Sequence, residues 1–259
     1  MISIENICFS YKNHKIIDGI SMELESTDIL GVVGPNGSGK TTLIRLISGV
    51  YSPDSGRILI DGHDIRSLKS KKLAQMVSVV PQNPNLPSGI TVFDLISMGR
   101  NPHLKLFEWS SSSDSTIINS AMKMTNIHNL AHRVLDTLSD GERQRAVISM
   151  ALAQESPVIL LDEPASNLDI ANQKVILNTI SNSVHTKNLA ALLTMHDLSL
   201  AAQYCNRIIM ISDGKIVAEG SPEKVITEQN IFLTYKTKVN VISHPVTRKP
   251  VVIPDYNQL

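Results

Sequence analysis

The stretch Ile29–Val33 (ILGVV) runs directly into Gly34–Thr41 (GPNGSGKT). The first five residues are apolar without polar alternation, which is typical of a strand that is covered on both faces in a parallel sheet. The residues from Thr42 to Ser48 predict a helix, and Gly49 ends it. A buried strand, a glycine-rich loop and a helix in this order predict an α/β fold.

The glycine-rich loop has the spacing of a phosphate-binding loop, G-x-x-x-x-G-K-[ST]. Its glycines let successive backbone N–H groups turn inward, which makes an anion site at the start of a helix. We expect Lys40 to neutralise the β- and γ-phosphates of ATP and the Thr41 hydroxyl to hold Mg²⁺. The alternative is a glycine-rich turn that carries a lysine by chance, and the flanking strand and helix argue against it. The predicted nucleotide-binding residues of this segment are Gly34, Pro35, Asn36, Gly37, Ser38, Gly39, Lys40, Thr41 and Thr42.

Three further apolar runs end in chemically useful residues. They are Val77–Val80 before Gln82, Val158–Leu161 before Asp162 and Glu163, and Ala190–Met195 before His196. In open α/β sheets, ligands bind at the carboxyl ends of the strands. The four strand ends are therefore predicted to form one site.

The roles of these polar residues differ. Asp162, at the end of a strand, suits a Mg²⁺ ligand of a nucleotide-hydrolysing enzyme. Glu163 is suited to orient or deprotonate the attacking water. The alternative interpretation is that Asp162 and Glu163 are simply two acidic residues at the start of a turn and have no catalytic role. His196 alone would more often be a structural histidine, but its place favours contact with the γ-phosphate. Gln82 alone is also weak evidence for a functional role, and its position after a predicted strand strengthens that evidence.

The residues outside the parallel core predict antiparallel strands at the beginning and a hairpin later. The segments Ile2–Phe9, Ile16–Leu24 and Gly56–Gly62 predict an N-terminal antiparallel sheet. Asp213-Gly214 lies between two β-branched runs, which predicts a hairpin over residues 207–217.

A helical region interrupts the core. Residues from about 88 to 155 lack parallel-strand runs and predict an inserted α-helical subdomain. Its serine run, Ser110–Ser113, predicts an exposed loop, and we interpret the neighbouring Trp109 as a packing or surface residue. After Gly220 we expect a short tail, residues 221–259, with one or two short helices and an extended end.

Composition excludes several classes of protein. The 259 residues include 24 basic and 24 acidic side chains, and this balance gives no electrostatic footprint for nucleic acid. Cys8 and Cys205 lack metal-binding spacing, so we expect a reduced, cytosolic protein. We find no signal peptide, and no apolar run approaches the ~18 residues of a spanning helix. We expect a soluble chain that reaches a membrane only through another protein.

Leu138–Gln144 (LSDGERQ) contains a helix start. Ser139, with Glu142 three residues later, forms a capping box before an apolar run. Most such boxes only start a helix. The same N–H groups and the positive end of the helix dipole also suit an anion, so the residues alone leave both readings open.

With Gly34–Thr41, Gln82, Leu138–Gln144, Asp162-Glu163 and His196 in this order, the chain resembles the ATPase subunits of ATP-binding cassette (ABC) transporters. The resemblance covers essentially residues 1 to 220, and this span is the predicted ATPase domain. It implies a P-loop NTPase (RecA-like) core with a mostly parallel sheet.

The resemblance also implies roles for single residues. Ser166–Asp169 (SNLD) resembles the D-loop of the family, and Tyr11 lies where the family places an aromatic ring that stacks on adenine. The implied Mg²⁺ ligands are Thr41, Gln82 and Asp162. The implied catalytic residues are Glu163, His196 and Gln82.

In this family, two copies close head to tail on two ATP molecules. Ser139 and Gly141 would then act on the ATP that the other copy holds. The usual pattern of the family is Leu-Ser-Gly-Gly-Gln, and Asp140 and Glu142 depart from it. Because a carboxylate aimed at the γ-phosphate would be repulsive, we expect Asp140 to point away from it.

A single cassette without fused spanning helices is more typical of an importer. Met98–His103 (MGRNPH) and Pro250–Pro254 (PVVIP) resemble the subgroup that serves importers of iron-siderophores, haem and cobalamin, with some members handling metals or oxyanions. The implied partners are a second copy, transmembrane permease subunits and, indirectly, a substrate-binding protein. The implied location is the cytoplasmic face of the inner membrane.

The sequence is compatible with three alternative functions. The chain could be a soluble ABC-type ATPase that acts on DNA, ribosomes or cluster assembly, but basic stripes, coiled-coil arms and a second cassette are missing from the sequence. A P-loop kinase for a small molecule would not need the Ser139 box, and it would act as a monomer. An ABC importer for another small solute is the third.

Overall fold

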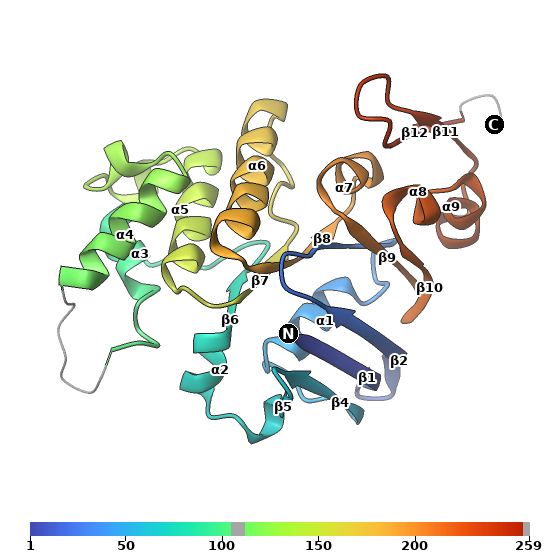
Figure 1. Ribbon diagram of the computed structural model, residues 1–259, viewed down its shortest axis with the longest axis horizontal. Coiled ribbons are helices and arrows are strands. Elements are labelled where there is room, and N and C mark those ends of the chain that lie inside the picture. Colours follow the sequence, from blue (N-terminus) through green and yellow to red (C-terminus); the bar gives the residue numbers. More distant parts are fainter. Residues whose placement is uncertain (105–111, 256–259) are drawn as a thin grey trace. The chain divides into compact units, whose positions relative to one another are not determined.

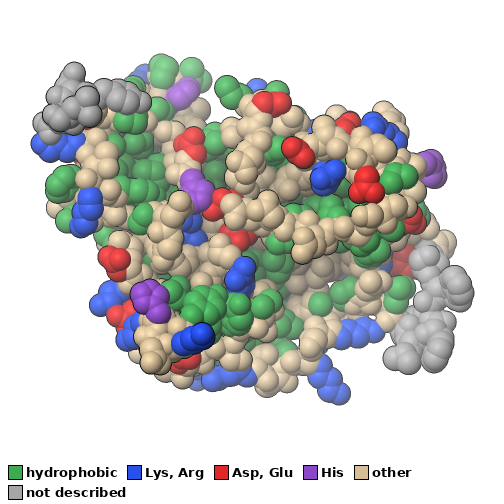
Figure 2. All heavy atoms as spheres, turned by 180° about the vertical axis from the view of Figure 1, so that it is seen from behind, with side chains coloured by type: hydrophobic (Ala, Val, Ile, Leu, Met, Phe, Trp, Pro, Cys, Tyr) green, Lys and Arg blue, Asp and Glu red, His purple; other side chains and the backbone are tan. Residues whose placement is uncertain are grey.

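The computed structural model of the protein describes residues 1–104 and 112–255. Contacts within the chain divide it into two compact units, Met1–Ser67 with Ala190–Leu259, and Leu68–Leu189 (Figure 1). Among the described residues, no helix has both the length and the apolar character that crossing a bilayer requires. Lys and Arg side chains are interspersed with Asp and Glu on the face shown in Figure 2.

The first unit begins with an antiparallel sheet. Its strands are β1 (Ile2–Tyr11), β2 (His14–Leu24), β4 (Ser55–Ile60) and β5 (His63–Asp64), in the order β2-β1-β4-β5. Buried residues alternate with more exposed ones along the first part of β1, because one face of an antiparallel sheet packs on the core. The predicted N-terminal antiparallel sheet is confirmed.

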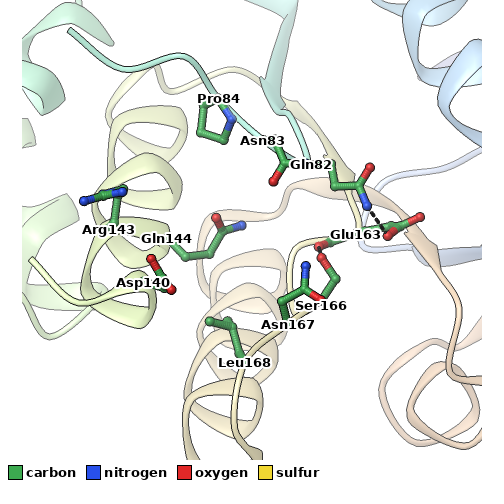
Figure 3. A pocket seen from close by; sticks show the side chains of 10 residues that line it. All are labelled: Gln82, Asn83, Pro84, Asp140, Arg143, Gln144, Glu163, Ser166, Asn167 and Leu168. Carbon is green, nitrogen blue, oxygen red and sulfur yellow. Dashed lines mark hydrogen bonds between the residues drawn. The ribbon is translucent and has the colours of Figure 1, made fainter. Parts of the chain in front are cut away.

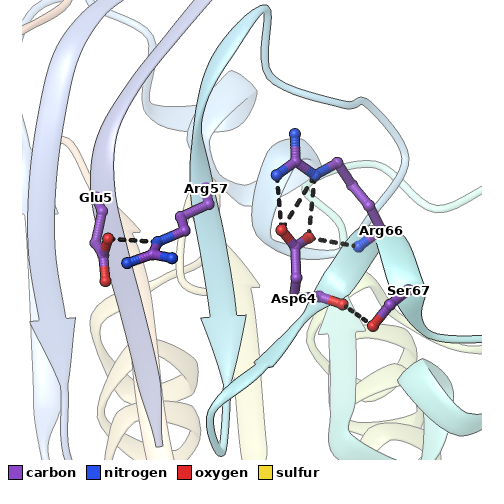
Figure 4. Close-up of polar contacts among 5 residues, drawn as sticks. All are labelled: Glu5, Arg57, Asp64, Arg66 and Ser67. Atoms are coloured by element: carbon purple, nitrogen blue, oxygen red, sulfur yellow. Dashed lines mark hydrogen bonds and ion pairs between the residues drawn. The ribbon is translucent and has the colours of Figure 1, made fainter.

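Two largely exposed ion pairs lie on this sheet (Figure 4). Arg57 Nε lies 2.5 Å from Glu5 Oε2, and Arg66 Nη2 lies 2.6 Å from Asp64 Oδ2. Exposed pairs of this kind contribute at most about 1 kcal/mol, because water and salt screen them.

The second sheet of this unit is centred on β3 (Ile29–Val33). β3 pairs in parallel with β8 (Ala190–Met195) and β9 (Arg207–Ser212), and β10 (Lys215–Gly220) pairs antiparallel with β9. All five residues of β3 are buried, as the uninterrupted apolar run predicts.

The connections at β3 and β9 follow local signals. The helix α1 (Lys40–Ile47) begins two residues earlier than predicted, directly after Gly39. Asp213 and Gly214 both have positive φ, 50° and 74°, which is the conformation of a two-residue hairpin turn. The predicted hairpin is confirmed.

The residues after Gly220 pack within the first unit. The helices α8 (Pro222–Val225) and α9 (Glu228–Tyr235) precede a hairpin of β11 (Val239–Ser243) and β12 (Pro250–Pro254). β12 lies on α7 (Leu198–Tyr204), where the Val252 N–H donates to Ser199 Oγ at 3.0 Å. The predicted helices are confirmed. The predicted extended end is a paired hairpin, whose six-residue connection carries no short turn signal.

The second unit combines two parallel strands with a group of helices. Its elements are α2 (Ser70–Met76), β6 (Val77–Val80), α3 (Val92–Met98), α4 (Ser112–Met124), α5 (Asp140–Ala153), β7 (Val158–Asp162) and α6 (Ile170–Lys187). β6 and β7 pair in parallel from Val77 opposite Val158 to Val80 opposite Leu161. Helices α3, α4 and α5 pack on one another (Figure 1). The helical character of this region is confirmed, and its bounds as an inserted subdomain stay a prediction.

The loop predicted at Ser110–Ser113 is wrong for its second half. Ser112 and Ser113 form the start of α4, with Asp114 in its first turn. Because serine and aspartate are favoured at helix starts as well as in loops, a serine cluster does not separate the two. Trp109, Ser110 and Ser111 lie outside the described residues.

Arg100, in the segment Met98–His103, ties the helices of the second unit together. It is buried, and its Nε donates to Asp114 Oδ1 at 2.8 Å. Its Nη1 donates to the backbone oxygen of Ala153 at 2.7 Å and to Glu155 Oε2 at 3.0 Å. Since Ala153 is the last residue of α5, the guanidinium satisfies a carbonyl that the helix itself leaves unpaired.

We predict that Asp114→Ala lowers the free energy of unfolding by about 3 kcal/mol, because it leaves a buried guanidinium short of its carboxylate. Chemical denaturation measures this change. The control is Glu5→Ala, which breaks an exposed ion pair and should cost about 1 kcal/mol or less. Equal losses in both variants would contradict the structural role of the buried pair.

Candidate functional site

The glycine-rich loop leaves β3 and turns at once into α1. Gly34 has a φ of 155°, and a Cβ there would lie 2.1 Å from the backbone oxygen of Ile211, so only glycine fits. Gly39, with a φ of 105°, is the last residue before α1. The loop therefore ends at a helix N-terminus, where unpaired N–H groups favour an anion.

Lys40 folds back over this loop. Its Nζ donates to the backbone oxygens of Gly34 at 2.8 Å and Pro35 at 3.0 Å, and the residue is only 6% exposed. Ser38 Oγ is buried and has no hydrogen-bond partner. A buried ammonium group and an orphaned hydroxyl in one loop are groups that a phosphate would satisfy.

Tyr11 lies at the end of β1 in an aromatic cluster. Its ring meets Phe9 edge-on at 5.0 Å and Tyr51 edge-on at 5.5 Å between centroids, and the residue is 38% exposed. Burial acts to raise the pKa of Tyr11, but hydrogen bonds with the side chains of Thr42, Tyr51 and Arg45 outweigh it and lower that pKa. Through Thr42, an accessible aromatic ring lies beside the first turn of α1.

His196 follows β8 as Gly34 follows β3. Val33 lies opposite Met195 in the parallel register, so His196 and Gly34 leave neighbouring strands at the same edge of the sheet. The His196 residue is exposed. An imidazole in this place can donate a hydrogen bond to an anion that binds at the strand ends.

In the second unit, Gln82 and Glu163 meet just beyond the ends of β6 and β7. Gln82 Nε2 donates to Glu163 Oε2 at 2.5 Å. Glu163 is only 9% exposed, has a φ of 51°, and directly follows the buried Asp162. A carboxylate fixed in such a place is suited to accept a proton from a bound water.

A pocket of about 280 Å³ opens beside Glu163 (Figure 3). Residues from the Gln82 segment, from the first turns of α5 and from the turn after β7 line it. They are Gln82, Asn83, Pro84, Asp140, Arg143, Gln144, Glu163, Ser166, Asn167 and Leu168. Gln144 Nε2 donates to the backbone oxygen of Pro164 at 3.1 Å, so α5 is tied to the segment that carries Glu163.

Ser139 starts α5, and the predicted capping box is confirmed. The Glu142 N–H donates to Ser139 Oγ at 3.4 Å, and the Ser139 N–H donates to Glu142 Oε2 at 2.8 Å. Ser139 Oγ also donates to that oxygen at 2.9 Å. These bonds from the backbone and side chain of Ser139 lower the pKa of Glu142. Asp140 is exposed in the first turn, and Gly141 is buried.

Some residues near the site carried no signal in the sequence. Arg45 and Tyr51 complete the aromatic cluster, with the Arg45 guanidinium 5.9 Å from the Tyr51 ring centroid. Tyr235, in α9, has a buried hydroxyl beside the Gly34 backbone. Burial raises the pKa of Tyr235 to about 12, and the neighbouring Gly34 backbone opposes that rise. The tail therefore reaches the first glycine of the loop, which only the folded chain reveals.

The predicted site residues fall into the two units. The first unit holds Tyr11, His196 and the loop from Gly34 to Thr42, and the second holds Gln82, Ser139, Gly141, Asp162 and Glu163. Within each unit, residues far apart in sequence are brought together at strand ends and helix starts.

Comparison with known proteins matches residues 17–166 to the family described as "ABC transporter". The ferric enterobactin transport ATP-binding protein FepC of Escherichia coli (strain K12) is 36% identical over 250 residues, which are 96% of this chain and 92% of FepC.

Solved structures agree with this family. One described as "an inward-facing conformation of a putative metal-chelate type ABC transporter" has a TM-score of 0.86 at 28% identity, covering 98% of this chain and 97% of that chain. The dimeric post-hydrolysis structure of the ATP-binding cassette MJ0796, bound to ADP and Pi, shares the fold, with a TM-score of 0.75 at 24% identity over 86% of this chain and 99% of that chain. The predicted α/β fold with a P-loop core is confirmed. The chain belongs to the ABC transporter family and is an ATP-binding, ATP-hydrolysing subunit.

Proposed function

We propose that the chain powers an importer of an iron–siderophore complex or a related chelate, with haem and cobalamin in the same class. The observation that carries this proposal is the similarity to a ferric enterobactin transport subunit along 96% of the chain. The likeness to a metal-chelate type transporter and the segments Met98–His103 and Pro250–Pro254 point the same way. A related metal or oxyanion belongs to the same proposed class of cargo, and an importer for another small solute is the second candidate.

The proposed nucleotide site uses the loop from Gly34 to Thr42. The Lys40 side chain and the positive end of the α1 helix dipole would take the β- and γ-phosphates, and Tyr11 would stack on the adenine. Mg²⁺ prefers oxygen ligands, and the Thr41 hydroxyl, the Asp162 carboxylate and the Gln82 amide oxygen fit that preference. The ion would neutralise charge on the phosphates.

Glu163 is the proposed general base. Its carboxylate would take the proton of the attacking water. His196 would hold the γ-phosphate in the position for attack by that water. Gln82 now donates to Glu163 through its amide nitrogen, which leaves its amide oxygen for a cation. A shift of Gln82 between these two partners would report nucleotide occupancy to the neighbouring helices.

Ser139 and Gly141 would act on the ATP of a second copy, in a head-to-tail dimer. The start of α5 offers backbone donors and the positive end of a helix dipole, which suit a phosphate. The proposed assembly adds transmembrane permease subunits and, through them, a substrate-binding protein. The chain would then lie at the cytoplasmic face of the inner membrane.

Two other classes remain as alternatives. A soluble ABC-type ATPase that acts on nucleic acid would present a basic surface, whereas the chain has 24 basic and 24 acidic side chains, which are interspersed on the face shown in Figure 2. A P-loop kinase would transfer phosphate to a small molecule as a monomer. A transporter subunit should dimerise when ATP binds, whereas a kinase should stay monomeric, so ATP-driven dimerisation distinguishes the two.

We predict that Lys40→Ala weakens ATP binding about 100-fold or more, since it removes the buried cation of the phosphate loop. Equilibrium binding of a fluorescent ATP analogue measures the change. Lys123→Ala, at an exposed position of α4, is the control and should bind like the parent. An unchanged affinity in Lys40→Ala would refute the phosphate assignment.

We predict that Glu163→Gln lowers ATP hydrolysis by ~10²- to 10⁴-fold and spares ATP binding, because the amide cannot take a proton. Phosphate release and nucleotide binding are measured on the same preparation. Glu223→Gln, at an exposed position of α8, is the control. Retained turnover in Glu163→Gln would assign the base to another residue.

We predict that a tagged chain, isolated from its own cells in mild detergent, brings down a polytopic membrane protein in about equal amount. Mass spectrometry identifies that protein, and its neighbours would narrow the cargo. Recovery of soluble proteins or nucleic acid alone would leave the ATPase chemistry intact and contradict the transport role.

A further inference from the structure

The first turn of α5 lies directly against the first turn of α6. A Cβ on Gly141 would lie 2.7 Å from both Cγ and Oδ1 of Asn172, so the Gly141 backbone touches the Asn172 amide. Position 141 therefore requires a glycine whether or not it contacts a ligand, because a side chain there would displace Asn172.

Asn172 uses both ends of its amide. Arg145 Nη1 donates to Asn172 Oδ1 at 2.9 Å, and Asn172 Nδ2 donates to Asp169 Oδ2 at 3.0 Å. The Asn172 N–H also donates to Asp169 Oδ1 at 2.7 Å, which caps α6 and lowers the pKa of Asp169. One half-buried side chain therefore joins α5 to the residue that ends the turn after Glu163.

The beginning of that turn is held from the same two helices. Gln144 Nε2 donates to the Pro164 oxygen at 3.1 Å, and Gln173 Nε2 donates to the Ala165 oxygen at 3.2 Å. The turn 164–169 is thus fixed at both ends, by Gln144 and Gln173 at one and by Asn172 at the other. A movement of the start of α5 would be transmitted to the segment that follows Glu163.

We propose that Asn172 is a positioning residue that aims the start of α5 at the nucleotide of a second copy and links that start to the Glu163 turn. This inference rests on the head-to-tail dimer of the proposed function. A residue in this position must accept a hydrogen bond from Arg145 and donate one to Asp169, and the short amide side chain of asparagine does both. An aspartate would place a second carboxylate beside Asp169, and an alanine would lose both contacts.

The test uses the Glu163→Gln parent, in which slow hydrolysis preserves ATP-bound dimers. Asn172→Ala in this parent should raise the dissociation constant of the ATP-driven dimer about tenfold, because two hydrogen bonds that hold the helix start are lost. Analytical ultracentrifugation with ATP measures it. The affinity of the isolated chain for ATP should not change, since Asn172 does not belong to the phosphate loop.

Asn182→Ala is the matched control, because Asn182 is an exposed asparagine on the same helix. Arg145→Met breaks the same contact from the other side and should weaken the dimer to a similar degree, which keeps the test valid if one variant is unstable. In a Ser139→Ala background, Asn172→Ala should add little, because Asn172 acts through the helix that Ser139 starts.

The outcomes separate the two proposals. Dimers of parental strength in Asn172→Ala and Arg145→Met, or full additivity with Ser139→Ala, would overturn the positioning role and leave the proposed function standing. A Glu163→Gln parent that stays monomeric with ATP would overturn the head-to-tail dimer and the positioning role together.

Discussion

The arrangement of the phosphate-binding loop in the first unit depends on the burial of β3 on both faces. A buried strand cannot leave its N–H and C=O groups to water, so each must pair within the protein, and β8 and β9 supply those pairs on either side. This pairing fixes where β3 ends. Gly34 can then pass close to Ile211, and α1 can start at a set distance from the sheet edge. The direction in which the N-terminus of α1 points follows from the same pairing.

The second unit meets a different constraint, because its helices are joined through polar side chains as well as apolar packing. Arg100 binds the carbonyl at one end of α5, and Asn172 touches the backbone at the other. The helix is therefore held at both ends by groups from other elements. Hydrogen bonds of fixed geometry add a directional constraint to the apolar packing and favour one position of the helix.

Local signals in the sequence predicted most of the fold. The uninterrupted apolar runs predicted β3, β6, β7 and β8, and Asp213-Gly214 predicted its hairpin, since in each case the conformation depends on neighbours in the chain. The hairpin of β11 and β12 and the start of α4 at Ser112 were missed, because pairing across a six-residue connection and the choice between loop and helix depend on the rest of the fold. The same limit applies at the site. The motif residues could be proposed from the sequence and stay predictions, whereas Arg45, Asn172 and Tyr235 are ordinary residue types whose contacts appear only in the folded chain.

The cap at the start of α5 has a consequence for selectivity. The Glu142 carboxylate already accepts the backbone N–H and the hydroxyl of Ser139. Any anion that takes these donors must displace a carboxylate that is tethered to the same helix and thus present at a very high local concentration. A weak or singly charged anion loses that competition, whereas a polyphosphate held by other contacts can win it. We therefore expect the Glu142 carboxylate to act as a competitor on the same helix, so that small, singly charged anions bind only weakly at the start of α5.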